Sequence, residues 1–113
     1  MSARRGEIWL AGFDPVQGHE QAGRRPALVL SVDEFNASGA ELVTVLPITS
    51  KHRPGIPSRI EIRPPEGGVR VRSYIIGEQT RTVSTRRLVK QIGVVSVPTM
   101  QKVSDVVRML LGL

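Results

Sequence analysis

The sequence predicts a small, mainly β structure: a mostly antiparallel, barrel-like sheet closed by one C-terminal α-helix. Three observations support this fold class. The 113 residues fit a single domain, residues 1–113. Short apolar runs punctuated by glycine, proline and aspartate continue as far as Val95, as expected for strands and turns. Only after that point do apolar residues recur at helical spacing. With 40% hydrophobic but only 4% aromatic residues, the core must be mostly aliphatic.

The first half of the chain predicts three strands. Gly6–Phe13 is a short, largely apolar run that ends at an Asp-Pro turn. Pro26–Val32 is an unbroken apolar run, typical of a strand covered on both faces, and proline is tolerated as its first residue. Asp33–Ser38 can form at most one helical turn. Glu41–Ile48 is the third strand, and its late proline predicts a sheet edge or a strand end.

The second half predicts a hairpin and two further strands. Residues 58–62 alternate polar and apolar residues, and Pro64–Gly68 separates them from residues 69–73. We interpret these two segments as a hairpin with one solvated, arginine-rich face. Residues 74–84 and 87–95 supply the remaining two strands.

The C-terminal segment predicts a helix. Ser96 can cap its N-terminus, and Pro98 falls in the first turn, where a missing N–H costs no hydrogen bond. Apolar residues then recur at intervals of three and four, at Met100, Val103, Val106, Val107, Leu110 and Leu111. We expect this apolar face to pack on the sheet and in part on a second copy of the chain.

The charge balance suggests a polyanionic partner. The chain has sixteen Lys and Arg residues, most of them arginine, and ten Asp and Glu residues, which gives a net charge of +6. Arginine binds phosphate oxygens in pairs, so nucleic acid is the first candidate and a solvated basic surface is the alternative.

Other classes of protein are disfavoured by composition. The chain has no cysteine, and His19 and His52 lack the spacing of metal ligands, so neither a metal site nor a cofactor is predicted. No apolar run is long enough to cross a bilayer, and Met1–Arg5 is not followed by a signal-like apolar segment. These features predict an intracellular, cytoplasmic protein with no membrane partner.

The segment Gly18–Arg25 is the strongest candidate for a functional site. It places a histidine, a glutamate, a glutamine and two arginines directly before a strand predicted to be buried. An arginine held by a rigid strand is costly unless it meets an anion. From these residues alone, Arg25 either forms a structural ion pair with Glu20 or binds an anionic ligand.

Four segments resemble successive motifs of the MazF/PemK family of toxin endoribonucleases, in order and in spacing. The resemblance extends over nearly the whole chain, and it is most specific in the glycine-rich loop before the apolar strand. The segments are "RRGEIWLAGFDP", "GHEQAGRRPALVLS", "VLPITS" and "GEQTRTVSTRRL".

This resemblance implies the SH3-like small β-barrel of the MazF, PemK and CcdB toxins, acting as a homodimer. It also implies the toxin of a type II toxin–antitoxin system, with a MazE-like antitoxin as cognate partner. The implied activity is that of an mRNA interferase. It cleaves single-stranded RNA at short sequences without a metal, and it leaves a 2′,3′-cyclic phosphate and a 5′-hydroxyl.

The resemblance also assigns roles to individual residues. Arg25 corresponds to the family's catalytic arginine, Thr49 to the small polar residue paired with it, and Glu20 to a loop glutamate implicated in proton transfer in some members. The positions that would line the RNA path are His19, Gln21, Arg24, Lys51, Arg53, Gln79 and Arg81.

Chemistry constrains the catalytic roles further. Arg25 and the Thr49 hydroxyl can both donate to the phosphate oxygens where charge accumulates. Because a guanidinium stays protonated in proteins, we do not expect Arg25 to act as the general base. That leaves Glu20, His19 or the substrate itself. His19, where related loops more often carry serine, is an RNA contact, a proton carrier or an ordinary loop residue.

Two alternatives of different class remain at this stage. One is a non-catalytic, gyrase-poison-type toxin of the same fold, although the C-terminal "MLLGL" offers no aromatic or polar tip for such a contact. The other is a plain RNA-binding SH3-like barrel, which explains the charge but not the joint presence of Arg25 and Thr49. The basic segment Lys51–Arg53 is either a solvated loop or an RNA clamp.

Overall fold

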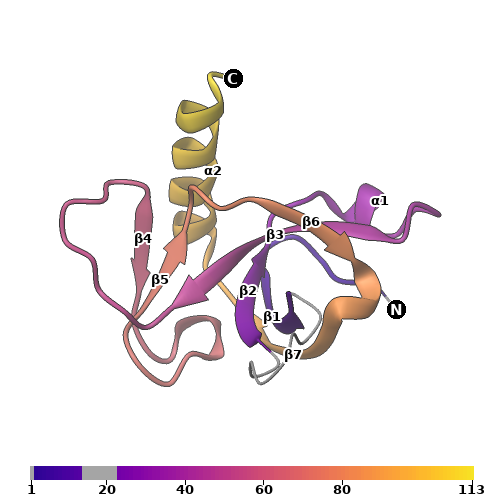
Figure 1. Cartoon of the computed structure of the whole chain (residues 1–113), viewed down its shortest axis with the longest axis horizontal. Coiled ribbons are helices and arrows are strands. Elements are labelled where there is room, and N and C mark those ends of the chain that lie inside the picture. The colour runs from indigo at the N-terminus through magenta and orange to yellow at the C-terminus, as the bar shows by residue number, and fades with distance from the viewer. Residues whose placement is uncertain (1, 14–22) are drawn as a thin grey trace.

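The computed structural model describes residues 2–13 and 23–113, and within them it forms seven strands and two α-helices (Figure 1). The helices are α1 (Asp33–Asn36) and α2 (Val97–Leu111), and two 3₁₀ turns are η1 (Glu66–Gly68) and η2 (Thr85–Arg87). The strands are β1 (Glu7–Gly12), β2 (Arg24–Val29), β3 (Leu42–Thr49), β4 (Arg59–Ile62), β5 (Ser73–Ile76), β6 (Arg81–Ser84) and β7 (Leu88–Val94). In this part of the chain, neither helix is long and apolar enough to span a bilayer.

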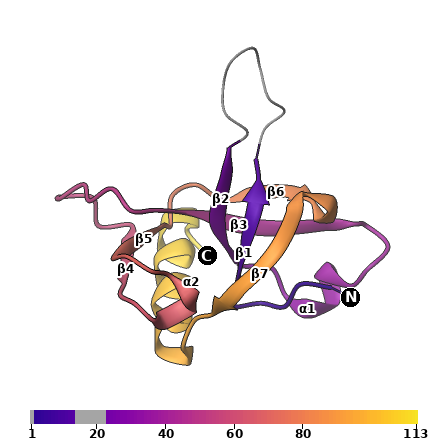
Figure 2. The same ribbon diagram turned by 90° about the horizontal axis from the view of Figure 1, so that it is seen from below.

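All strand pairings are antiparallel, in the order β4-β5-β3-β2-β1-β7, with β6 paired to β3. The predicted fold class is therefore confirmed: a mainly antiparallel sheet with one C-terminal helix. The arrangement is barrel-like, but among the described residues the sheet does not close. In Figure 2, α2 lies on the β4–β5 side of the molecule and α1 on the opposite side.

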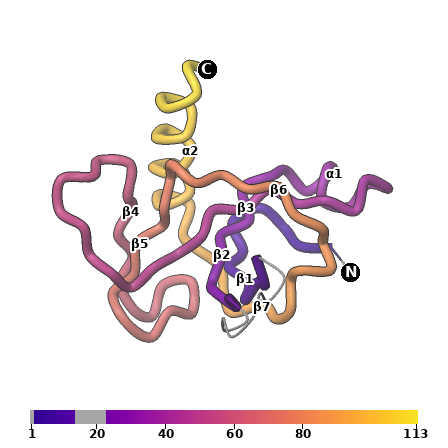
Figure 3. Tube along the Cα trace, viewed as in Figure 1, coloured from indigo at the N-terminus to yellow at the C-terminus, as the bar shows by residue number. Residues whose placement is uncertain are grey.

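β3 is the central strand, and it changes partners along one edge. Its first residues pair with β6, and its last two pair with β5. The change occurs around Pro47, which cannot donate to a ladder. Consequently β5 and β6 lie one after the other beside β3, joined by the turn at Gly77 (Figure 3). The single strand predicted for residues 74–84 is therefore two.

The predicted hairpin was wrong in its second strand. Residues 58–62 do supply β4, but its partner is β5 rather than residues 69–73. The Pro-Pro-Glu-Gly-Gly segment folds into η1, with positive φ at Gly67 and Gly68, and most of the following residues remain irregular. Strand-like alternation alone does not form a strand where the preceding turn directs the chain away from a partner.

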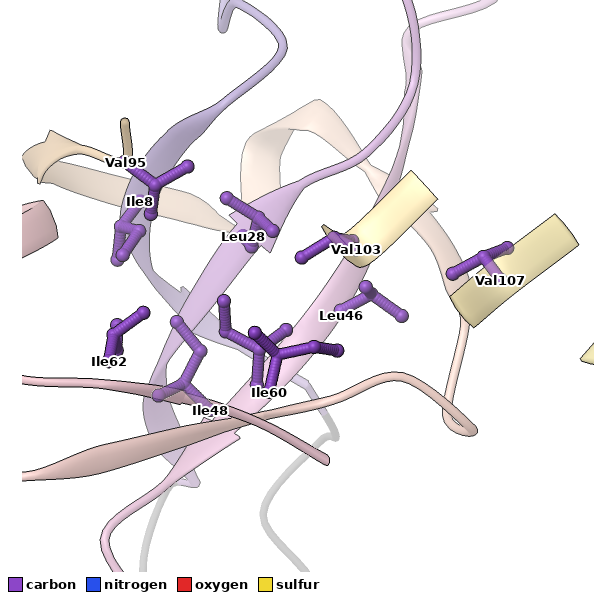
Figure 4. Close-up of a cluster of buried hydrophobic side chains, with 10 residues drawn as sticks. Ile8, Leu28, Leu46, Ile48, Ile60, Ile62, Val95, Val103 and Val107 are labelled. Carbon is purple, nitrogen blue, oxygen red and sulfur yellow. The ribbon is translucent and has the colours of Figure 1, made fainter. Parts of the chain in front are cut away.

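The sheet is covered on both faces, as the unbroken apolar run of β2 predicted. Alternate residues of β2 and β3 enter two separate clusters of buried side chains. Leu28, Leu46 and Ile48 meet Val103 and Val107 of α2 in the larger cluster (Figure 4). The smaller cluster lies on the opposite face and contains Ala3, Ala11, Phe13, Ala27, Val29, Val43, Val45 and Val83.

The predicted N-terminal cap of α2 is confirmed. The Ser96 hydroxyl accepts a hydrogen bond from the Thr99 amide at 3.3 Å. Pro98 falls in the first turn, and Gly112 ends the helix in the left-handed conformation, with φ of 71°. The helix thus begins where the sequence indicates, and its apolar face lies on the larger core cluster.

Glu66 of η1 fixes the start of α2. Its carboxylate accepts hydrogen bonds from the Ser96 amide and the Ser96 hydroxyl, both at 3.0 Å. Burial alone would raise the pKa of Glu66, but hydrogen bonds from Thr99 and Ser96 and the nearby charge of Lys102 hold it below the ordinary value of 4.5. The carboxylate also lies at a helix N-terminus, where negative charge is favoured.

Glu66→Gln is expected to lower the free energy of unfolding by about 1 kcal/mol at pH 7, because a charge-assisted contact is lost. Since the pKa of Glu66 is lowered on folding, the stabilisation is complete above pH 4.5 and declines as pH falls through the lowered value. Urea unfolding from pH 7 to pH 3 should therefore show the two proteins converging. Glu34→Gln, which removes an exposed carboxylate of α1, is the control. A difference that stays constant with pH would contradict this explanation.

Candidate RNA-cleavage groove

Arg25 and Thr49, which are far apart in the sequence, line the same groove. The groove has a volume of about 680 Å³. Its lining residues come from β1, β2, the end of β3, the stretch from η1 to the start of β5, and β7. Its lining residues are Leu10, Arg25, Pro26, Ile48, Thr49, Ser50, Lys51, Gly68, Val69, Arg70, Val71, Ser73, Lys90, Gln91 and Ile92.

Arg25 is held by a regular strand but has an exposed side chain. It lies in β2, in register with Ala11 of β1, just before the residues of β2 that enter the core. Within residues 2–13 and 23–113, no carboxylate forms an ion pair with Arg25. The Arg25 side chain lines the groove, and none of the described carboxylates neutralises its charge there. The alternative ion-pair partner, Glu20, lies outside those residues.

Thr49 ends β3 in register with Tyr74 of β5. Its hydroxyl oxygen accepts a hydrogen bond from the Lys51 amide at 3.1 Å. Because that amide occupies one lone pair of the oxygen, the hydroxyl hydrogen can donate to a ligand in the groove. The same contact turns the chain so that Lys51 also lines the groove.

The groove is strongly cationic. Arg25, Lys51, Arg70 and Lys90 contribute four positive charges, and no carboxylate is among the described lining residues. Apolar side chains such as Leu10, Val69 and Val71 lie between them. A surface with this combination suits a chain of phosphates joined to bases and sugars.

Sequence reasoning missed Lys90 and Gln91, and it misplaced Arg70. The arginine-rich strand face predicted for residues 69–73 would have carried both Arg70 and Arg72, but residues 69–72 are irregular. Arg72 binds Glu61 at 3.1 Å, whereas Arg70 lines the groove. Lys90 reaches the groove because β7 pairs with β1, where Leu10 lies opposite Lys90 between two register shifts. Only the pairing of the first and last strands would have shown this.

Several other predicted RNA contacts lie apart from the groove. Among them, Arg81 of β6 stacks its guanidinium over the Phe13 ring at 4.9 Å and donates to the Phe13 carbonyl at 3.3 Å. His19 and Gln21, like Glu20, are outside the described residues. The described positions that are absent from the groove lining are Arg24, Arg53, Gln79 and Arg81, and contact of these residues with RNA stays a prediction.

No three His, Cys, Asp or Glu side chains gather in the described part of the chain in a way that could hold a metal ion. The donors that face the groove are cationic nitrogens, hydroxyls and one carboxamide, that of Gln91. These groups bind and polarise anions.

Comparison with known proteins agrees with this geometry. Residues 4–111 match the family described as PemK-like, MazF-like toxin of type II toxin–antitoxin system. The chain belongs to this family. It is 34% identical over 114 residues to Endoribonuclease MazF9 of Mycobacterium tuberculosis, with 97% of each chain covered. It is 33% identical over 111 residues to Endoribonuclease MazF of Staphylococcus saprophyticus, with 97% of this chain and 92% of the relative covered.

Solved MazF structures share the fold. MazF from Deinococcus radiodurans superimposes with a TM-score of 0.82 at 29% identity, covering 100% of this chain and 99% of the other. A MazE–MazF structure from the same organism gives a TM-score of 0.84 at 30% identity, covering 100% and 98%. The barrel-like MazF/PemK fold inferred from the motifs is therefore confirmed.

Proposed function

We propose that this toxin is an endoribonuclease that cleaves single-stranded messenger RNA in the Arg25–Thr49 groove, with residues 1–113 acting as one domain. The observation that carries the proposal is the convergence of Arg25 and Thr49, from β2 and β3, on one groove with four cations. The relatives named as endoribonucleases in M. tuberculosis and S. saprophyticus support it.

The chemistry proposed for the groove is an internal transesterification. The ribose 2′-oxygen attacks the adjacent phosphorus, and the bond from phosphorus to the 5′-oxygen breaks. The products are a 2′,3′-cyclic phosphate and a 5′-hydroxyl. Arg25 and the Thr49 hydroxyl donate to the non-bridging oxygens, where negative charge grows in the phosphorane-like transition state. No step in this scheme requires a metal.

Two protons must move in this reaction. The 2′-hydroxyl loses one, and the leaving 5′-oxygen gains one. Arg25 remains protonated and cannot serve as the base. We assign proton transfer to Glu20, His19 or the substrate. Replacing His19 and Glu20 together without a large loss of rate would exclude both side chains.

We assign the other groove cations, Lys51, Arg70 and Lys90, to phosphates that flank the cleaved one. Lys90→Gln is expected to weaken binding of an RNA blocked by a 2′-deoxy sugar at the cut. It should also reduce the slope of log K against log salt by about 0.7, the value for one phosphate contact with a single strand. Fluorescence anisotropy at several salt concentrations measures both effects. Lys102→Gln replaces an exposed lysine of α2 and should change neither property. An unchanged slope for Lys90→Gln would contradict the assignment.

The proposed partners follow from the same family. A MazE-like antitoxin is the proposed cognate partner, supported by the similar MazE–MazF structure from D. radiodurans. We further propose a homodimer, because α2 leaves large apolar side chains exposed, among them Val97 at 82% and Met109 at 76%. Because messenger RNA is the proposed substrate, we also propose a cytoplasmic location.

The two alternative functions are not favoured. Neither a gyrase-poison-type toxin nor a plain RNA-binding barrel would require Arg25 and the Thr49 hydroxyl to line one groove. The relatives similar to this chain over nearly its full length are also named as endoribonucleases.

The decisive experiment incubates the purified protein with a long single-stranded RNA in excess EDTA and maps the new 5′ ends. A matched oligonucleotide carries one 2′-deoxy sugar at the mapped cut. We expect discrete cuts that persist in EDTA and disappear with the deoxy sugar. Intact RNA from a folded protein would overturn the proposed activity, and cuts that need added Mg²⁺ would overturn the proposed chemistry.

A further inference from the structure

The segment that follows Thr49 is fixed at two points. The first is the hydrogen bond from the Lys51 amide to the Thr49 hydroxyl at 3.1 Å. The second is a stack of the His52 imidazole on the Tyr74 ring, with centroids 5.0 Å apart and planes inclined by only 10°. The segment is thus more ordered than a solvated basic loop would be.

Tyr74 gives His52 a rigid support. It lies in β5, in register with Thr49 of β3 on one side and with Glu61 of β4 on the other. Its side chain is buried, while His52 is exposed. One face of the imidazole therefore rests on Tyr74, and the other face is open to solvent.

The exposed His52 ring offers a flat surface of a kind that the groove lining lacks. The groove offers cations for phosphates and donors for the reacting oxygens, but no aromatic residue is among its described lining residues. Proteins that bind single-stranded RNA commonly stack bases on aromatic rings or histidine beside such a cationic path. His52 places a flat face next to Lys51, one residue beyond the groove lining.

We propose that His52, supported by Tyr74, is a base-stacking platform of the RNA site. A nucleobase flanking the cleaved phosphate on the Thr49 side stacks on the open face of the imidazole. This inference rests on the proposed endoribonuclease function and adds a positioning contact that the catalytic pair does not provide.

Three replacements of His52 separate stacking from packing. His52→Ala removes the platform and is expected to lower kcat/KM about five- to 100-fold, mainly through KM. His52→Phe keeps a flat ring and should retain activity within about threefold of the unmodified protein. His52→Leu still covers Tyr74 but cannot stack, and it should resemble the alanine variant. Rescue by leucine as complete as that by phenylalanine would overturn the proposal in favour of a packing role.

An abasic scan of the substrate locates the base. Single ribo-abasic residues, which keep the 2′-hydroxyl and the phosphates, are placed in turn beside the mapped cut. At one flanking position we expect a loss of similar size to that of His52→Ala, and no further loss when both changes are combined. Losses that multiply at every position would overturn the stacking contact. Cleavage unaffected by His52→Ala would overturn this proposal alone, whereas intact RNA with the unmodified protein would overturn the proposed function as well.

Discussion

Arg25→Ala is expected to lower kcat for RNA cleavage about 10²- to 10³-fold, the usual loss when one preorganised donor to a transition-state oxyanion is removed. The reason lies in the placement of this side chain. β2 fixes its backbone beside β1, and no ion pair with a described carboxylate competes for its charge. Single-turnover cleavage of a short RNA at saturating protein measures the effect on the chemical step.

The controls for Arg25 test charge and geometry separately. Arg25→Lys keeps the charge but loses the planar, bidentate fork, so it should recover only part of the activity. Arg86→Ala removes an exposed arginine of η2 that is not among the groove lining residues, and cleavage should be nearly unchanged. Equal losses for Arg86→Ala and Arg25→Ala would mean that overall charge, rather than position, governs cleavage.

Local sequence signals predicted the fold where they agreed with one another. The Ser96 cap, Pro98 and the three-to-four spacing all indicate one helix, and α2 forms within those limits. The unbroken apolar run of β2 indicated burial on both faces, and its alternate residues do enter both core clusters. These features depend on short-range chemistry that a sequence displays directly.

Pairing partners were harder to predict, because they depend on turns between distant segments. Residues 69–73 alternate like a strand, yet η1 directs them away from β4, and β5 takes their place. The same turn sends Arg70 into the groove and Arg72 to Glu61. A periodic pattern defines which residues could share a face, but it does not determine which strand will cover that face.

The residues of the candidate site also fall into two groups: those that the sequence predicted and those that only the fold revealed. Arg25 and Thr49 were predicted from motifs of the resembling family, and the structure places both on one groove. Lys90 belongs to no such motif. It reaches the groove only because the last strand pairs with the first across two register shifts. Functional residues that belong to a motif can thus be recognised in the sequence. A functional residue on a distant strand can be recognised only once the strand pairing is known.

Gly93→Ala is expected to destabilise the protein strongly, because η1 lies close against β7 at this position. A Cβ at this position would lie 2.5 Å from the carbonyl carbon and oxygen of Gly67 and 2.7 Å from the Gly68 amide nitrogen. These are backbone atoms that cannot rotate away, so η1 or β7 must move. We expect a loss of about 3 kcal/mol in the free energy of unfolding, at the upper end of the usual range for overpacking, measured by urea denaturation.

The same substitution should also impair RNA binding, because both displaced segments line the groove. Gly68 is the last residue of η1, Val69 and Arg70 follow it directly, and Lys90 lies in β7 three residues before Gly93. Binding of the 2′-deoxy-blocked RNA, measured under conditions where the variant is folded, should weaken several-fold. Gly39→Ala, where an added Cβ meets nothing within 4 Å, should change stability by no more than about 0.5 kcal/mol and leave binding intact. A stable Gly93→Ala variant with normal RNA affinity would show that η1 does not rest against β7 in this way.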